Sequence, residues 1–224
     1  MRFARIHLNG NPYLGIFACA NDAVAFIPRS ATAGAAKVIA ESLGVETVRL
    51  TLLRTELIGA FAVMNSNGIL VPSDATRSEL EAIRQALDIN VGVVETRFNA
   101  LGNLVVANDK GAIAATLYGK RELKTMSDVL GVEVVGAKVA GLNIVGSLCS
   151  SNNTGTLVSP RATDEDLELV RETLKTYVER GTANFGAGNV GTCLLANSKG
   201  AVAGTPTTGI EMGRIQRVFE GSGW

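Results

Sequence analysis

The sequence predicts an α+β fold in which five pseudo-symmetric repeats form a closed ring, a β/α propeller with five blades. A glycine recurs about every 44 residues, and the same strand and helix pattern follows each copy. A spare strand at the N-terminus supplies the piece that the fifth repeat lacks. Because the period runs through the whole chain, we expect a single domain over residues 1–224, anchored at Gly15, Gly59, Gly102, Gly146 and Gly191.

Each repeat begins with a predicted β-hairpin. An asparagine stands six residues after every anchoring glycine. Three residues later four of the five copies have a second glycine, whereas the first copy has Val24. Asparagine and glycine both tolerate the left-handed backbone conformations that hairpin turns require. The turn asparagines are Asn21, Asn65, Asn108, Asn152 and Asn197.

An amphipathic helix and a further strand complete each repeat. Apolar residues follow the i, i+3, i+7 spacing of one helix face, for example Leu80, Ile83 and Leu87 in the second repeat. Capping-box pairs mark the starts of three helices: Thr76 with Glu79, Thr208 with Glu211 and, in a weaker form, Thr163 with Asp166. The fifth repeat lacks the last strand, and "RFARIHL" at the N-terminus replaces it. Joining the two ends closes the ring without unpaired sheet edges.

Composition and charge narrow the function. Lys plus Arg and Asp plus Glu both total 21, so no overall charge excess is available to hold a polyanion. The apolar stretches are far too short to cross a bilayer, and the N-terminus lacks the apolar region of a secretory signal, so we expect a cytoplasmic protein. Three cysteines without CxxC spacing argue against a disulfide framework and a zinc site.

A catalytic ring is the main alternative. Five-unit rings of similar architecture include enzymes that act on guanidino groups with a cysteine nucleophile, a histidine and acidic partners, which must converge on one point. The only histidine is His7, and the three cysteines occupy three different positions of the repeat, so they do not share one face. We therefore interpret Cys19, Cys149 and Cys193 as buried structural residues.

Two further motifs also have structural explanations. The segment Gly186–Gly191 matches GxGxxG but precedes a strand-like run instead of a helix, so it does not predict a dinucleotide site. Basic residues cluster on the third and fifth helices. They either belong to an ordinary solvent-exposed helix face or contact a phosphate backbone. These clusters are Lys120, Arg121 and Lys124, and Arg214 with Arg217.

The residues next to the anchoring glycines are a candidate site. We expect them at one end of the inner strands, and there the five copies diverge. A shared backbone with varied side chains fits either a recognition surface on a rigid scaffold or the packing of the inner ring. These residues are Ile16, Ala60, Asn103, Ser147 and Thr192.

Several strings add a family resemblance to the period. They are "RFNALGN", "NSNGILVP" with "TRSELEAIRQAL", "RGTANFG", "ANSKGAVAG" and "TTGIEMGRIQRVF". Together they resemble the archaeal translation initiation factor six family, the counterpart of the eukaryotic anti-association factor, over essentially the full length. The resemblance implies a pentein-type ring that binds the intersubunit face of the large ribosomal subunit and sterically prevents association with the small subunit. It implies a role in initiation and in large-subunit biogenesis, and no catalysis.

The resemblance also implies the partner and part of the site. It implies docking through a ribosomal protein near the sarcin-ricin RNA loop, with limited rRNA contact, by a monomer that needs neither cofactor nor metal. In the family the asparagine of "ALGN" belongs to the docking surface, and here it corresponds to Asn103, close to Leu101. The repeat extends this candidate site to Ile16, Ala60, Ser147 and Thr192, and the C-terminal segment adds Thr207 and Thr208.

Overall fold

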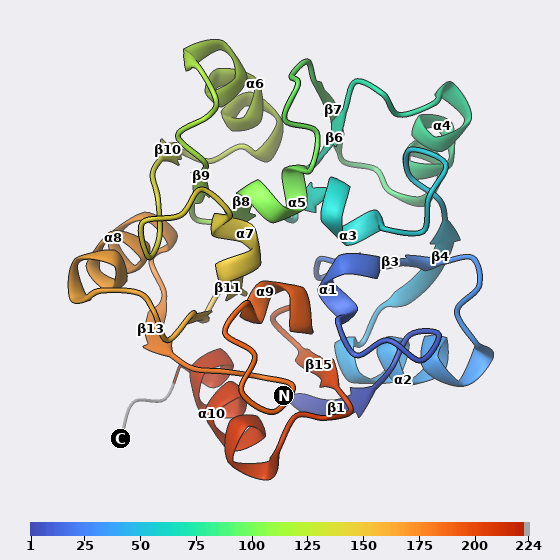
Figure 1. The fold of residues 1–224 in the computed structure, drawn as a ribbon. Helices are drawn as coiled ribbons and strands as arrows, with labels where there is room; N and C mark the ends of the chain where they lie inside the picture. The colour runs from blue at the N-terminus through green and yellow to red at the C-terminus, as the bar shows by residue number, and fades with distance from the viewer. Residues whose placement is uncertain (222–224) are drawn as a thin grey trace.

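The protein is a ring of five blades around a central axis, as Figure 1 shows for the computed structural model. The structure describes residues 1–221, so the last residue of the predicted domain, Trp224, lies outside the described residues. Each blade contains a three-stranded sheet, and longer helices surround the sheets on the outside of the ring. The predicted α+β ring of five repeats is confirmed.

Every blade has a one-turn helix, a hairpin, a longer helix and a third strand. The first blade has α1 (Leu14–Phe17), β2 (Cys19–Ala20), β3 (Val24–Pro28), α2 (Ala33–Leu43) and β4 (Glu46–Leu50). The second has α3 (Ile58–Phe61), β5 (Val63–Met64), β6 (Gly68–Pro72), α4 (Arg77–Ala86) and β7 (Asn90–Val94). The third has α5 (Leu101–Leu104), β8 (Val105–Ala107), β9 (Ala112–Ala114), α6 (Lys120–Leu130) and β10 (Val134–Gly136). The fourth has α7 (Val145–Leu148), β11 (Cys149–Ser151), β12 (Gly155–Val158), α8 (Asp164–Leu174) and β13 (Tyr177–Arg180). The fifth has α9 (Val190–Cys193), β14 (Leu194–Ala196), β15 (Gly200–Gly204), α10 (Gly209–Glu220) and β1 (Arg2–Ile6).

The middle strand of each sheet pairs antiparallel with its hairpin partner and parallel with the third strand. In the fifth blade the third strand is β1, which pairs in parallel with β15 from Arg2 opposite Gly200 to Ile6 opposite Gly204. The N-terminal strand therefore closes the ring as predicted.

The repeat pattern suggested that the anchoring glycines stand at the starts of strands. In the structure they lie inside the one-turn helices instead. A helix of four residues is too short to show a helical period, so the sequence pattern merged it with the strand that follows. Cys193 accordingly ends α9 instead of lying on a strand, whereas Cys19 and Cys149 begin β2 and β11. The GxGxxG segment runs into α9, a single turn at the centre of the ring.

The five outer helices begin and pack much as predicted. All three capping boxes are present, with the hydroxyls of Thr76, Thr163 and Thr208 each accepting a bond from the backbone N–H three residues on. Each helix packs against the sheet of the preceding blade, for example α6 against β6 and β7. The second glycine of the repeat allows this contact, because a Cβ on Gly68 would lie 2.2 Å from the carbonyl oxygen of Val129 in α6. Within residues 1–221, no helix combines the length and apolarity that a membrane crossing needs.

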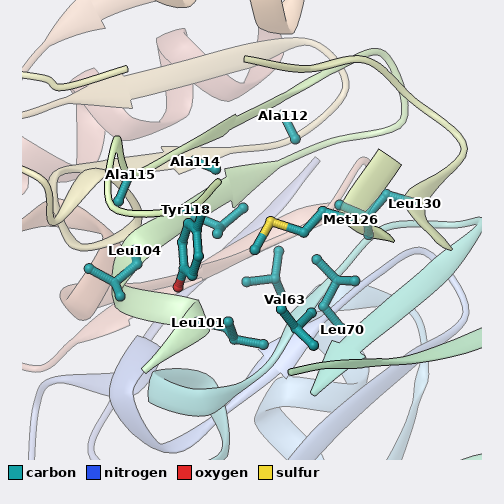
Figure 2. Packing of buried hydrophobic residues seen from close by; sticks show 12 residues of the cluster. Val63, Leu70, Leu101, Leu104, Ala112, Ala114, Ala115, Tyr118, Met126 and Leu130 are labelled. Carbon is teal, nitrogen blue, oxygen red and sulfur yellow. The ribbon is translucent and has the colours of Figure 1, made fainter. Parts of the chain in front are cut away.

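The apolar core is divided into five clusters, one at each junction between blades. Figure 2 shows the cluster in which Val63 and Leu70 of the second blade pack with Leu101, Met126 and Leu130 of the third. The other clusters repeat this arrangement, combining one blade with side chains of the preceding blade. Neighbouring blades therefore share their core, and the ring is built as one cooperative unit.

The first blade departs from the repeat. Val24 replaces the second glycine, and its side chain packs with Ile83 and Leu87 of the next outer helix. That helix, α4, ends at Ala86 and is followed by Leu87 in an extended conformation. The other four outer helices are longer and are followed by a left-handed residue: Gly44, Gly131, Lys175 and Gly221. The side chain of Val24 fills the space into which the last carbonyl groups of the other helices pack.

Candidate functional site

The two ends of the ring have different chemistry. At one end the one-turn helices α1, α3, α5, α7 and α9 surround the axis, and the outer helices begin; we call it the glycine end (Figure 1). At the other end the hairpin turns surround the axis, and the outer helices finish beside them; we call it the asparagine end. In every blade the chain runs from one end of the ring to the other and back in the same order of elements. Equivalent loops of all five blades therefore lie at the same end of the ring.

The one-turn helices pack against each other through the anchoring glycines. A Cβ on Gly102 would lie 1.8 Å from the carbonyl oxygen of Gly59, and the equivalent distances at the other four glycines are 1.9 to 2.2 Å. Each glycine meets the carbonyl of the glycine in the preceding blade, with Gly15 meeting Gly191. Real Cβ atoms do not approach oxygen so closely, so only glycine permits five backbones to meet around the axis.

The turn asparagines form a second closed ring. The side-chain Nδ2 of each one donates to the backbone carbonyl of the asparagine in the next blade, at 3.0 to 3.2 Å, and Asn197 closes the circle by donating to Asn21. Each Oδ1 also accepts from the backbone N–H groups two and three residues on, which holds its own turn. The asparagines, predicted as turn formers, thus also link the blades.

The axial channel offers little room for a substrate. It contains a cavity of about 120 Å³ lined by the anchoring glycines and small or apolar side chains such as Ala18, Val63 and Leu195. A second cavity, lined by the turn asparagines at the asparagine end, has a volume of about 30 Å³. Sites for small organic ligands usually enclose roughly 300 Å³ or more.

The thiols lack the features of a nucleophile. Burial raises the pKa of the Cys19 and Cys149 thiols to about 12 and that of Cys193 to about 11, and a nearby Asp166 carboxylate adds to the rise at Cys149. A reactive cysteine needs a lowered pKa. His7 is exposed just beyond the end of β1. Within residues 1–221 no three His, Cys, Asp or Glu side chains are placed to hold a metal.

Five of the candidate residues lie at equivalent places on the glycine end. Each follows its anchoring glycine in the one-turn helix: Ile16, Ala60, Asn103, Ser147 and Thr192. Ala60 and Ser147 are buried, whereas Ile16, Asn103 and Thr192 are half-buried. The Ser147 hydroxyl donates to Asn103 Oδ1 at 3.2 Å, which fixes the orientation of the amide. Both expected features, packing around the axis and varied side chains, are therefore present.

Two candidate side chains do not reach the surface. Leu101 is fully buried in the core cluster of Figure 2, where it faces Met126 and Val63. Thr207 is also fully buried, and its hydroxyl exchanges hydrogen bonds with Asn184. Both side chains are used inside the protein, Leu101 in the apolar core and the Thr207 hydroxyl in holding Asn184, so a docking role for these two residues stays a prediction. Thr208 is half-buried and caps α10.

Sequence reasoning missed a set of exposed apolar side chains on the glycine end. Three of them precede one-turn helices, one lies between an inner strand and an outer helix, and one is the second residue of α10, so all five are at this end: Tyr13, Leu142, Phe185, Leu117 and Ile210. Among residues 1–221, the other large apolar side chain exposed to this degree is Met1, at the asparagine end. The repeat pattern does not distinguish them, because it identifies apolar positions that the copies share, and these five residues occupy different positions of the repeat.

The basic clusters are largely neutralised by acidic neighbours. The ion pairs are Arg121 with Glu95 at 3.5 Å, Lys124 with Asp128 at 3.0 Å, and Arg214 and Arg217 with the shared Glu179. Exposed pairs of this kind contribute little stability. Because of these ion pairs, the two basic clusters do not form the extended positive surface that binding to nucleic acid usually requires.

By its architecture this protein is a closed five-bladed ring whose most distinctive surface is an apolar end. The model of the eIF-6 family matches residues 3–218. The chain is 39% identical to Translation initiation factor 6 of Pyrococcus abyssi over 224 residues, which cover 98% of this chain and 99% of that protein. It is 43% identical to Translation initiation factor 6 of Aeropyrum pernix over 221 residues, which cover 97% and 94%. The chain belongs to the eIF-6 family.

A solved structure is also similar at low level. DDAH from Pseudomonas aeruginosa, in a complex with citrulline, superposes with a TM-score of 0.45 and 11% identity, covering 75% of this chain and 68% of that chain. A likeness of this size carries no argument about function.

Proposed function

We propose that this protein binds the intersubunit face of the large ribosomal subunit through its glycine end and sterically prevents the small subunit from joining. It acts in the cytoplasm, in translation initiation and large-subunit biogenesis, as a monomer without cofactor or catalytic activity. The observation that carries the proposal is the gathering of five exposed apolar side chains at one end of a rigid ring. The similar proteins of Pyrococcus abyssi and Aeropyrum pernix are both named Translation initiation factor 6.

The main partner within the subunit is a ribosomal protein close to the sarcin-ricin loop, with limited contact to rRNA. Two properties of the glycine end support a protein partner. Several exposed apolar side chains on one face are typical of protein–protein interfaces, whereas binding to RNA relies on Lys and Arg side chains facing phosphates. The chain has no net charge, and its basic clusters are paired with acids.

A rigid ring suits a steric role. The one-turn helices meet backbone to backbone, and the asparagine ring ties every hairpin turn to the next. A surface held in this way loses little conformational entropy on binding, so more of the contact energy remains as affinity. Once one end is bound, the body of the ring occupies the space that the small subunit needs.

Co-sedimentation with purified large subunits tests the proposal. We expect the protein to sediment with large subunits and to reduce the yield of joined ribosomes when small subunits are added. If it stays in the supernatant and small subunits join at the normal rate, the proposal is wrong. Loss of the thiols provides a further test, since replacing Cys19, Cys149 and Cys193 by Ala should leave subunit binding intact.

Asn103→Asp tests the position of the docking surface. The aspartate keeps the oxygen that accepts from Ser147, so the fold should survive, but it adds a charge at the centre of the apolar end. We expect weaker co-sedimentation with an unchanged melting temperature. Asn90→Asp, at the start of β7 and at the asparagine end, is the matched control and should bind normally. A large fall in the melting temperature of Asn103→Asp would instead make Asn103 a structural residue.

A further inference from the structure

Two side chains on the fifth blade are far more exposed than any other large apolar group in residues 1–221. Phe185 is 81% exposed and Ile210 is 86% exposed, whereas the other four such residues are 38 to 40% exposed. The two segments that carry them are adjacent, because the backbone N–H of Phe185 donates to the carboxylate of Glu211, the residue that follows Ile210. Leaving two such groups in water opposes folding slightly and does nothing for the core.

The backbone at Phe185 is held in a conformation that side chains disfavour. Asn184 and Phe185 both have positive φ, 49° and 62°, and Gly186 follows at 97°. The equivalent turns of three other blades have the same left-handed pair, at residues 9–10, 53–54 and 140–141, so the conformation belongs to the repeat. A bulky aromatic residue is nevertheless an uncommon occupant of left-handed backbone. An asparagine or glycine at position 185 would relieve the strain, so fold stability does not explain the phenylalanine.

One buried carboxylate holds this loop in place. Glu211 accepts from the N–H groups of Phe185 and Gly186 at 3.2 and 2.8 Å, from the hydroxyl of Thr182 at 2.8 Å and from the backbone and hydroxyl of Thr208. The carboxylate is itself almost fully buried, with 9% of the residue exposed. Phe185 is therefore presented outward by a rigid, preorganised loop instead of extending from a flexible one.

Charge beside the pair points to the chemistry of the partner. Arg214 lies one helical turn after Ile210 on α10, and Arg217 follows on the same face. Both guanidinium groups share the single carboxylate of Glu179, so neither arginine has an acidic partner of its own in these ion pairs. The Arg214 side chain is 44% exposed and available to a partner. A complementary surface would be an apolar recess with an acidic rim.

We propose that Phe185 and Ile210 form an apolar anchor by which the ring binds a protein of the large ribosomal subunit, at a recess whose acidic rim faces Arg214. This inference rests on the proposed function and adds to it, since it locates a second contact on the outer edge of the fifth blade, away from the axis. A protein fits better than RNA because Ile210 cannot stack on a base and an acidic rim is what the paired arginines complement.

The main variant is Phe185→Asn combined with Ile210→Ala. Asparagine adopts the left-handed conformation more readily than phenylalanine, and alanine is a better helix former than isoleucine. We expect an unchanged or raised melting temperature together with co-sedimentation weakened by at least about tenfold, the loss typical of interface hot spots. Replacing a residue whose role is structural would lower the melting temperature. Weaker binding together with an unchanged or raised melting temperature therefore indicates a role in binding. Glu46→Ala, at the asparagine end, is the control and should bind like the parent protein.

Further variants identify the partner and the failure modes. Phe185→Leu keeps an apolar side chain and should retain most binding; if Phe185→Trp binds and Phe185→Leu does not, the contact is a stacked base and the protein partner is wrong. Arg214→Gln should weaken binding several-fold, and an unchanged affinity would overturn the acidic rim. If the parent protein binds and the double variant binds equally well, the anchor is refuted while the proposed function stands. If the parent protein itself fails to sediment with large subunits, the proposed function and the partner named here both fall.

Discussion

The asparagine ring yields a quantitative comparison between two residues that the sequence makes look equivalent. Asn108 and Asn21 occupy the same position of the repeat and are 4% and 6% exposed. Asn108 Nδ2 donates both to the carbonyl of Asn152 and, at 2.9 Å, to the carbonyl of Leu174 at the end of α8. Asn21 has the first type of bond, to Asn65, and lacks the second, because Val24 and the shorter α4 remove the helix carbonyl from its reach.

Replacement by alanine should therefore cost more at Asn108 than at Asn21. Asn108→Ala removes these two donor bonds and two acceptor bonds from Lys110 and Gly111, together with a longer contact of 3.4 Å from Nδ2 to the Ser151 hydroxyl that is left out of the sum. At about 1 kcal/mol for each hydrogen bond, the loss is about 4 kcal/mol. Asn21→Ala removes one donor bond and two acceptor bonds, and the same reasoning gives about 3 kcal/mol.

Urea unfolding followed by circular dichroism measures both values. We expect an unchanged m-value for each variant and a lower midpoint for Asn108→Ala than for Asn21→Ala, by the equivalent of about 1 kcal/mol. Asn65→Ala should behave like Asn108→Ala, since Asn65 also donates to a helix carbonyl, that of Leu130. Equal midpoints for Asn21→Ala and Asn108→Ala, or the reverse order, would refute the reasoning that the helix bond stabilises the ring.

Three other predictions concern the glycines, the buried carboxylates and the thiols. Gly102→Ala should destabilise the ring by about 3 kcal/mol or more, because the new Cβ would collide with backbone atoms that cannot move away. Gly213 is exposed on α10 with open space around it, so Gly213→Ala should be neutral or stabilising. Thermal unfolding compares the two variants. Burial by itself raises the pKa of Glu211, but the hydrogen bonds from Thr208, Gly186 and Thr182 outweigh it and hold the pKa below its ordinary value. The stabilisation from the charged Glu211 is therefore present at neutral pH and lost as the pH falls through the folded-state pKa. We expect Glu211→Gln to lower the unfolding midpoint at pH 7 and to make that midpoint depend less on pH in the acid range. If the midpoints of the variant and the parent protein fall in parallel as the pH is lowered, this prediction is wrong. Cys149 and Cys193 are buried as predicted, whereas Cys19 is half-buried. The thiols of Cys149 and Cys193 should therefore resist alkylation at pH 8 in the native protein and react after unfolding in urea; rapid native labelling of these two, read by mass spectrometry, would overturn their assignment as buried.

The repeat in the sequence is enough to predict the number of blades, the order of their strands and outer helices, and the closure of the ring, but not the one-turn helices. A period of about 44 residues, with a helical stripe in every copy, leaves few other architectures. The missing fifth strand and the spare N-terminal strand required each other, and β1 pairs with β15 accordingly. Capping boxes were also predictable, because Thr76 and Glu79 are only three residues apart and their bonds depend on local backbone alone.

Only the tertiary structure decided which side chains face water and which join the blades. Leu101 and Asn103 lie two residues apart in one helical turn, yet the first is fully buried and the second half-buried, because the neighbouring blade covers one side of the turn. The asparagine ring joins residues separated by whole blades, up to Asn197 and Asn21, so no local pattern could show it. The position of Phe185 likewise depends on Glu211 of α10, 26 residues further along the chain, and is therefore set by a tertiary contact.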